Sequence, residues 1–172
     1  GSLATPACTE RQNAYTGWLR SGPNYTPQMV VNGKTDVVGY KVESVAKTLK
    51  SMQRKIEDIP VAASEGAFEA ALPDLTEKAA EIEVWLVVYD IPHEITVAEG
   101  NNRGKIISYA NMVSKMEPLA IWDGRPEIRT VAAELEDYHA GFAILAQDSK
   151  TGEIYAAGQY RKPVVLTTEG TE

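Results

Sequence analysis

Few side chains in this sequence are suited to covalent or metal chemistry, and they lie far apart. Cys8 is the single cysteine among 172 residues, so no disulfide can form within this sequence. The two histidines, His93 and His139, have no cysteine near them. A metal site needs several such ligands at short spacing, so the sequence predicts neither a metal site nor a cofactor.

Cys8 lies near the start of a predicted helix, and three interpretations of it stay open. A free cysteine is commonly a small buried hydrophobic residue that needs no function. Cys8 could instead pair with a cysteine outside this sequence. It could also be a reactive thiol, because the positive end of a helix favours the thiolate, although no base is adjacent in sequence.

The polar stretch Gly100–Lys105 carries a second set of candidate residues, which are Asn101, Asn102, Arg103 and Lys105. Backbone amides and two cations in such a loop can bind an anion. A polar stretch flanked by glycines, between two strand-like runs, is also what a hairpin connection requires. The loop is therefore predicted either as an anion site or as a turn only.

The composition is typical of a soluble globular protein, with 44% hydrophobic and 24% charged residues. The formal net charge is −7, and the basic residues are interleaved with acidic ones. This argues against nucleic acid as a partner, because phosphate binding needs a clustered basic surface. No apolar run is long enough to span a membrane, and no signal peptide opens the chain. We expect a mature form or a fragment.

The first 59 residues predict a helix, a β-hairpin and a second helix. Thr5 and Pro6 suit the start of the first helix, and a Ser-Gly-Pro sequence suits its end. Two β-branched runs flank the Asn-Gly pair at 32–33, which indicates a tight hairpin because both residues tolerate positive φ. Apolar residues then recur every three or four positions from about 41 to 58, which is typical of an amphipathic helix.

From Pro60 onward, short strand-like runs recur between turns, as an antiparallel β-sandwich requires. Ile82–Tyr89 is the most strand-like of them, because it is rich in β-branched and aromatic residues. Val113–Ile121 fits neither period, and its neighbours favour a strand. The sequence therefore predicts an α+β protein with one unit at 1–59, an all-β unit at 60–166 and a flexible tail at 167–172.

The order of the first elements resembles the second half of a thioredoxin fold. In that fold a cis proline precedes a strand, a hairpin follows, and a last helix covers the sheet. Thr26-Pro27 stands where the cis proline belongs, so we expect its peptide bond to be cis. Two strands are marginally stable alone, so this partial unit would need further strands from outside the sequence.

Motifs along most of the chain resemble one bacterial family in their order and spacing. These motifs are Thr9-Glu10-Arg11-Gln12, Tyr25-Thr26-Pro27-Gln28, Asn32-Gly33, Gly100 to Lys105, Tyr109 and Trp122-Asp123-Gly124. The family is catalogued as domain of unknown function 1223, a group of secreted proteins in which a thioredoxin-like domain precedes a β domain. Asn101 departs from the family pattern, which usually has glutamate at that position.

The resemblance implies an earlier segment with a Cys-x-x-Cys pair, which this sequence lacks, and Cys8 lies beyond the place of that pair. It makes Tyr25, Thr26, Pro27 and Gln28 a platform that pairs with an extended protein substrate. The same turn can also serve only to join a helix to a strand. The resemblance further implies a periplasmic or secreted protein, with a missing or cleaved amino-terminal segment as a partner.

Two functions stay open. In the first, the complete protein is a thiol-disulfide oxidoreductase, and this chain alone gives no turnover because one cysteine cannot cycle between dithiol and disulfide. In the second, the protein is a non-catalytic binding or assembly protein whose β domain recognises a partner. The resemblance does not choose between them, since fold does not imply function.

Overall fold

A computed structural model describes residues 6–52, 56–78, 81–100 and 102–163. The described residues form an α+β protein with few helices and many strands in several sheets, as predicted. In chain order the elements are α1 (Pro6–Leu19), β1 (Gln28–Val31), β2 (Thr35–Val38), α2 (Val42–Ser51), β3 (Glu57–Asp58), β4 (Val61–Ser64), β5 (Ala67–Leu72), β6 (Ile82–Asp90), β7 (His93–Thr96), β8 (Ile106–Tyr109), β9 (Val113–Trp122), β10 (Glu127–Val131), β11 (His139–Asp148) and β12 (Ile154–Arg161).

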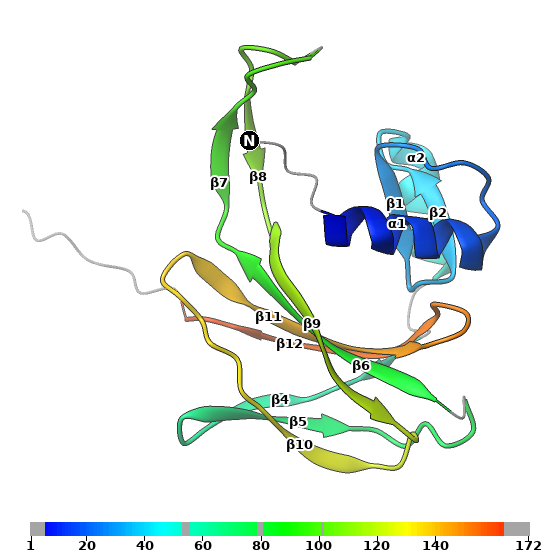
Figure 1. The fold of residues 1–172 in the computed structure, drawn as a ribbon, viewed down its shortest axis with the longest axis vertical. Helices are drawn as coiled ribbons and strands as arrows, with labels where there is room; N and C mark the ends of the chain where they lie inside the picture. The colour runs from blue at the N-terminus through cyan, green and yellow to red at the C-terminus, as the bar shows by residue number, and fades with distance from the viewer. Residues whose placement is uncertain (1–5, 53–55, 79–80, 101, 164–172) are drawn as a thin grey trace, which may run out of the picture.

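The centre of the molecule is a five-stranded sheet in the order β3-β12-β11-β6-β9. A three-stranded sheet, β10-β5-β4, lies against one face of it (Figure 1). Side chains alternate between the two faces of a strand, so every second residue of β6 and β11 points to the space between the sheets. These residues are the centre of the hydrophobic core and are almost fully buried: Ile82, Val84, Leu86, Val88, Phe142, Ile144 and Ala146.

A smaller unit of two helices and the β1–β2 hairpin lies over the other face of the five-stranded sheet (Figure 1). The hairpin is the predicted one, with Val31 paired to Thr35 and positive φ at both Asn32 and Gly33. The Thr26-Pro27 peptide bond is cis, as predicted. This unit is thinly packed, because Tyr15 and Val31 are its only buried hydrophobic residues in the described ranges.

Two boundaries in the first unit differ from the sequence prediction. The prediction of a helix up to residue 58 is wrong, because α2 ends at Ser51 and β3 pairs in parallel with β12. Backbone pairing to an open sheet edge therefore prevails over the apolar periodicity at that point. After α1, Arg20 already takes a left-handed conformation (φ 52°), ahead of Gly22 (φ 86°). The predicted cap Thr5 and the predicted tail 167–172 lie outside the described residues.

The segment that fitted neither period is strand β9, as its neighbours favoured. Its register against β6 shifts twice, once between Val84 and Trp85 and once between Val88 and Tyr89. Each shift moves the following side chains relative to the inner face of the sheet, and this breaks the regular alternation. The irregular pattern of β9 therefore has its cause in the pairing.

His139 begins β11 and is buried, with 8% of its surface exposed. Its Nδ1 accepts a hydrogen bond of 2.9 Å from the backbone N–H of Glu136. Its Nε2 lies 4.0 Å from Oδ1 of Asp90, a buried oxygen that has no hydrogen-bond partner within the described ranges. The imidazole thus fixes the turn that leads into the central strand.

Replacing His139 with alanine is expected to lower the free energy of unfolding by about 1–2 kcal/mol, because the Glu136 N–H loses its acceptor. His139→Asn keeps a side-chain oxygen near the position of Nδ1 and is expected to recover part of that loss. Urea denaturation of the three proteins measures both effects. Equal losses in the two variants would show that ring packing, rather than the hydrogen bond, matters here.

Candidate functional site

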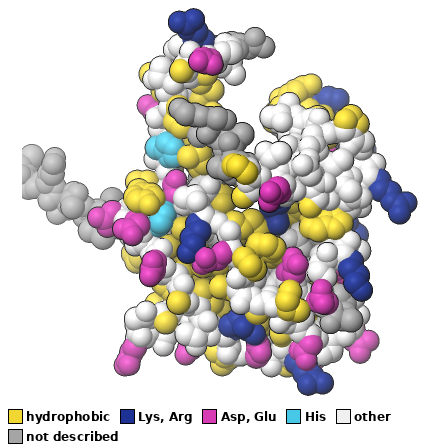
Figure 2. All heavy atoms as spheres, viewed as in Figure 1, with side chains coloured by type: hydrophobic (Ala, Val, Ile, Leu, Met, Phe, Trp, Pro, Cys, Tyr) yellow, Lys and Arg dark blue, Asp and Glu magenta, His cyan; other side chains and the backbone are white. Residues whose placement is uncertain are grey.

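A cavity of about 590 Å³ lies between α1 and the outer face of the five-stranded sheet. Figure 2, which views the molecule across its layers, shows hydrophobic side chains in the middle of the molecule, near the level of α1 and the sheet below it. α1 and three strands, β6, β9 and β11, form the walls. The side chains used below are Cys8, Glu10, Arg11, Ala14 and Trp18 from the helix, and Trp85, Val87, Met116 and Leu145 from the sheet.

The outer face of the sheet is apolar because of the alternation along β6. Its even-numbered residues from Ile82 to Val88 point into the core, so Trp85 and Val87 point to the opposite face. Met116 from β9 and Leu145 from β11 line the same cavity beside them. An apolar surface of this kind must be covered by another element, and here α1 covers part of it.

A buried polar cluster holds α1 against the end of β11. Gln147 is completely buried, and its amide nitrogen donates to the Tyr15 hydroxyl at 2.9 Å and to the Gly152 carbonyl at 2.6 Å. Nη2 of Arg11 donates to the Gln147 amide oxygen at 3.1 Å and to the Tyr15 hydroxyl at 3.0 Å. Trp18 packs edge-on against Tyr15, with ring centroids 5.3 Å apart. The helix is thus fixed by one network.

Arg11 brings a positive charge to the wall of the cavity. Its guanidinium carbon lies 5.1 Å from the ring centroid of Tyr15 and 5.8 Å from that of Trp85, which is within cation–π range. Its hydrogen-bond partners in the described part of the chain are all neutral. Glu10 also lines the cavity, but it is exposed and forms no ion pair with Arg11 in the structure described.

A second polar network supports the predicted platform residues. The Tyr25 hydroxyl donates to Oδ2 of Asp36 at 2.7 Å, and Gln28 donates to the same oxygen at 2.8 Å. Gln12 of α1 donates to the Tyr25 carbonyl at 2.9 Å. Burial opposes ionisation of the Asp36 carboxyl, but the hydrogen bonds from Tyr25 and Gln28 outweigh it, and the pKa of Asp36 lies below its usual value.

The other two platform residues, Thr26 and Pro27, are exposed at the start of the hairpin. The Pro27 carbonyl accepts a 2.8 Å hydrogen bond from the backbone N–H of Gly39. Cys8 is also exposed, but it lies at the cavity, whose lining includes none of residues 25–28. The structure therefore joins Tyr25 and Gln28 in one network through Asp36, with Thr26 and Pro27 exposed between them, and puts Cys8 elsewhere, on α1.

We expect the free energy of unfolding to fall as the pH rises from about 10 to about 12, because the Tyr25 hydroxyl loses its proton less readily in the folded protein than in the unfolded chain. Burial, and after it the Asp36 carboxylate, raise the pKa of Tyr25 from 10.0 to about 12. The unfolded chain loses this proton first, so the contribution is complete below pH 10 and disappears as the pH passes the folded value. Denaturation across this window measures it. The free energy of unfolding of Tyr25→Phe should fall less steeply over this range than that of the wild type. An identical fall in both proteins would contradict the assignment to Tyr25.

The predicted anion-loop residues lie at the tip of the β7–β8 hairpin, which projects away from the central sheet (Figure 1). Backbone bonds from Arg103 to Gly100 and from Lys105 to Asn102 form a turn there. Nζ of Lys105 donates to the Asn102 side chain at 3.0 Å, and Asn101 lies outside the described residues. The turn interpretation accounts for this geometry, and anion binding stays a prediction.

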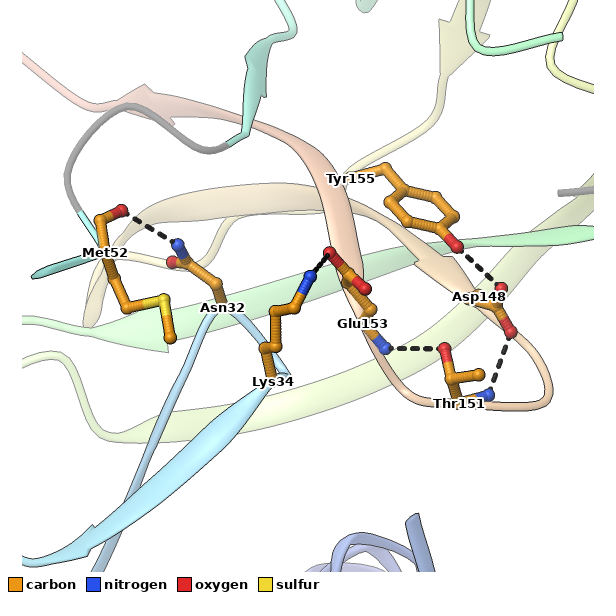
Figure 3. A network of polar contacts seen from close by, with 7 residues as sticks. All are labelled: Asn32, Lys34, Met52, Asp148, Thr151, Glu153 and Tyr155. Atoms are coloured by element: carbon orange, nitrogen blue, oxygen red, sulfur yellow. Dashed lines mark hydrogen bonds and ion pairs between the residues drawn. The ribbon is translucent and has the colours of Figure 1, made fainter. Parts of the chain in front are cut away.

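The tip of the β1–β2 hairpin docks on the turn between β11 and β12 (Figure 3). Lys34 and Glu153 form an ion pair of 2.7 Å, and the backbone N–H of Ile154 donates to the Asn32 carbonyl at 2.8 Å. Within the turn, Asp148 accepts hydrogen bonds from the Tyr155 hydroxyl at 2.7 Å and from the Thr151 N–H at 2.8 Å. The two predicted units are therefore joined by direct contacts beside the cavity.

The sequence alone did not single out the residues that line this cavity or hold its helix in place, namely Arg11, Tyr15, Trp18, Trp85 and Gln147. One signal was available: Gln147 directly follows the strongly apolar run Phe142–Ala146, where a polar residue at a buried strand position needs a partner. Two of its partners, Arg11 and Tyr15, lie more than a hundred residues away, on α1. Local patterns do not contain that information.

Within the described ranges, no group of three or more histidine, cysteine, aspartate or glutamate side chains is arranged to hold a metal ion. Neither α1 nor α2 is long and apolar enough to cross a membrane.

Comparisons with known proteins identify the family. A model described as "Protein of unknown function (DUF1223)" matches residues 2–147, whereas no curated protein matches significantly. A crystal structure of a protein from Agrobacterium tumefaciens is similar in fold, with a TM-score of 0.73 and 21% sequence identity. The similarity covers 94% of this chain and 72% of the other. Because the family model matches most of its length, the chain belongs to the DUF1223 family of proteins of unknown function.

Proposed function

We propose that this chain is a binding protein that takes an apolar ligand between α1 and the outer face of the five-stranded sheet. The observation that carries the proposal is the cavity of about 590 Å³. Small-ligand sites are usually clefts of roughly 300–1,000 Å³ with mostly apolar walls and a few placed polar groups. Trp18, Trp85 and Leu145 supply the apolar walls, and Arg11 supplies a polar group.

The way α1 is attached supports the same function. Hydrogen bonds to the buried Gln147 fix the helix at its middle, while Cys8 and its neighbours near the start of the helix remain exposed. A cavity with one fixed wall is open before the ligand arrives, so little ordering is needed on binding. This function is non-catalytic. Strands of the β unit line one side of the site, and α1 lines the other.

Titration with Nile red, a neutral apolar dye, tests the proposal. One dye is expected to bind per chain and to change the fluorescence of Trp18 and Trp85. Ala14→Phe places a ring in the cavity and should weaken binding by roughly tenfold or more. Ala132→Phe, at an exposed alanine outside the cavity, is the matched control and should bind like the wild type. Equal binding by both variants would refute the cavity as the site.

A second proposal concerns the complete protein, as a secreted or periplasmic thioredoxin-like protein with thiol-disulfide oxidoreductase activity. The amphipathic helix α2 favours it, because α2 buries none of its residues, and Val42 and Leu49 are 76% and 49% exposed. Such an apolar helix face normally covers a sheet. A thioredoxin-like unit would supply that sheet from an amino-terminal segment outside this sequence, with the β unit as a sandwich beside it.

In this proposal Tyr25, Thr26, Pro27 and Gln28 form the platform for a protein substrate. The complete protein should reduce a model disulfide above background, whereas this chain should not, because Cys8 cannot cycle alone. Intact-mass analysis first establishes whether an amino-terminal piece accompanies the chain. No rate from the complete protein, with its cysteines present and reduced, would eliminate the redox proposal and leave the binding proposal untouched.

A further inference from the structure

The charge of Arg11 at a mostly apolar cavity points to a particular class of ligand. We infer that the cavity binds a medium-chain fatty acid, with the carboxylate on the Arg11 guanidinium and the acyl chain between α1 and the sheet. This inference rests on the proposed binding function, and it names the ligand that this function would serve.

The Arg11 guanidinium has N–H donors that are not used by its hydrogen bonds to Tyr15 and Gln147. A guanidinium carries five N–H donors, and both recorded bonds of Arg11, to Tyr15 and to Gln147, come from Nη2. Nε and Nη1 form no hydrogen bond in the described part of the chain. Each of their N–H groups can donate a charge-assisted hydrogen bond to a carboxylate oxygen, and such a bond is roughly twice as strong as one between neutral groups. The remaining donors of the guanidinium therefore suit a carboxylate better than an alcohol or an amide.

The groups around Arg11 hold it in place without cancelling its charge. Gln147 directs its amide oxygen at the guanidinium, because its amide nitrogen is engaged by Tyr15 and by the Gly152 carbonyl. The rings of Tyr15 and Trp85 flank the cation. A fixed cation with neutral partners keeps its attraction for an anion, and in partly buried surroundings that attraction is stronger than in bulk water.

The remaining walls suit an acyl chain. Trp18, Val87, Met116 and Leu145 present apolar surface from the helix and from three neighbouring strands. Each methylene removed from water should strengthen binding roughly threefold to fourfold, until the cavity is full. Affinity is therefore expected to rise from hexanoate to octanoate to decanoate, and acetate should not bind measurably.

The charge on the ligand is tested with decanoate and decanol, which differ only in the head group. Both are titrated below their aggregation limits while the fluorescence of Trp18 and Trp85 is followed. The dissociation constant of decanoate is expected to be at least about tenfold lower than that of decanol, because a hydrogen bond between charged groups contributes about that much to affinity. Arg11→Gln should remove this preference and leave decanol binding in place, and retained decanol binding shows that the cavity is still formed.

Two further variants sharpen the assignment. Arg20→Gln removes an exposed arginine just after α1 and should leave both affinities unchanged. Glu10→Gln removes the exposed carboxylate at the cavity and should strengthen decanoate binding but not decanol binding. If Arg20→Gln weakens decanoate as much as Arg11→Gln does, the effect is one of total charge and the inference fails.

The outcomes separate this inference from the proposed function. Equal binding of decanoate and decanol, unchanged in Arg11→Gln, would overturn carboxylate recognition while the cavity remains a binding site. Nile red binding without binding of either decyl compound would overturn the fatty-acid class alone. Acetate binding as tight as decanoate binding would identify a bare anion site and also overturn it. Failure of the dye and of both decyl compounds would overturn the binding function itself.

Discussion

Replacing Gly152 with alanine is expected to lower the free energy of unfolding by about 2–5 kcal/mol and to displace α1 from the sheet. Gly152 has φ of 74°, a left-handed conformation that costs an alanine roughly 1–2 kcal/mol. A Cβ there would lie within 3.0 Å of three atoms of the Trp18 ring. Moving a packed aromatic ring adds about 1–3 kcal/mol. Because Trp18 also lines the cavity, Nile red binding should weaken as well.

Two other glycines separate the causes of this effect. Gly66→Ala meets the same left-handed penalty, with φ of 73° and nothing within 4 Å of the new Cβ, so it isolates the backbone cost. Gly17→Ala lies within α1 with open space around it and should be neutral or slightly stabilising. Urea denaturation measures all three. A loss in Gly152→Ala no larger than in Gly66→Ala would show that contact with Trp18 is unimportant.

Gln147→Leu is expected to lower the free energy of unfolding by about 2–4 kcal/mol, although leucine is similar in size. The substitution removes the donor to the Gly152 carbonyl and to the Tyr15 hydroxyl, and the acceptor for Arg11. Losing the donor to the buried Gly152 carbonyl costs about 1–3 kcal/mol. The bonds of Gln147 to Tyr15 and Arg11 are lost as well, although these two residues stay bonded to each other. Gln147 is fully buried, so water cannot replace the amide without rearrangement.

The matched control for this substitution is Gln159→Leu, at an exposed glutamine on β12. Its amide oxygen accepts a long hydrogen bond of 3.4 Å from the Tyr89 hydroxyl, which the Tyr160 carbonyl also accepts, so the substitution should change stability by less than about 1 kcal/mol. Chemical denaturation compares the two, and near-ultraviolet circular dichroism reports the packing of Tyr15 and Trp18. A small loss in Gln147→Leu, with an unchanged aromatic signal, would show that α1 is held mainly by apolar contacts.

The sequence predicted the elements well where a local pattern determines them. The hairpin at Asn32-Gly33 follows from two residues that tolerate positive φ. β6 follows from its β-branched and aromatic composition, and its inner residues are fully buried. α2 follows from its periodicity, but the periodicity predicts a longer helix than the chain forms, because Glu57 and Asp58 pair with β12 instead.

The candidate site could not be predicted in the same way. Its walls combine α1 with strands from the distant second half of the chain, and no local period records which helix covers which face. Trp85 lies in an apolar run of sequence, which is typical of a core residue. In the structure it points to the outer face of the sheet, because Val84 and Leu86 on either side of it point into the core. The hydrogen bond between Arg11 and Gln147 shows that α1 and β11 contribute to the same site, and this contact exists only in the folded chain.

The close approach of Gly33 to Gly152 has a practical consequence for dissecting the protein. A Cβ on Gly33 would overlap the Gly152 carbonyl, so the hairpin and the β11–β12 turn meet backbone to backbone. A fragment that starts at residue 60 would lack α1 and the β1–β2 hairpin. Its side chains Trp85, Val87 and Leu145, which face α1 in the whole chain, would then be exposed to water. Fragments with such a bared apolar face tend to self-associate. Recombinant work on either half alone should therefore begin with a solubility screen.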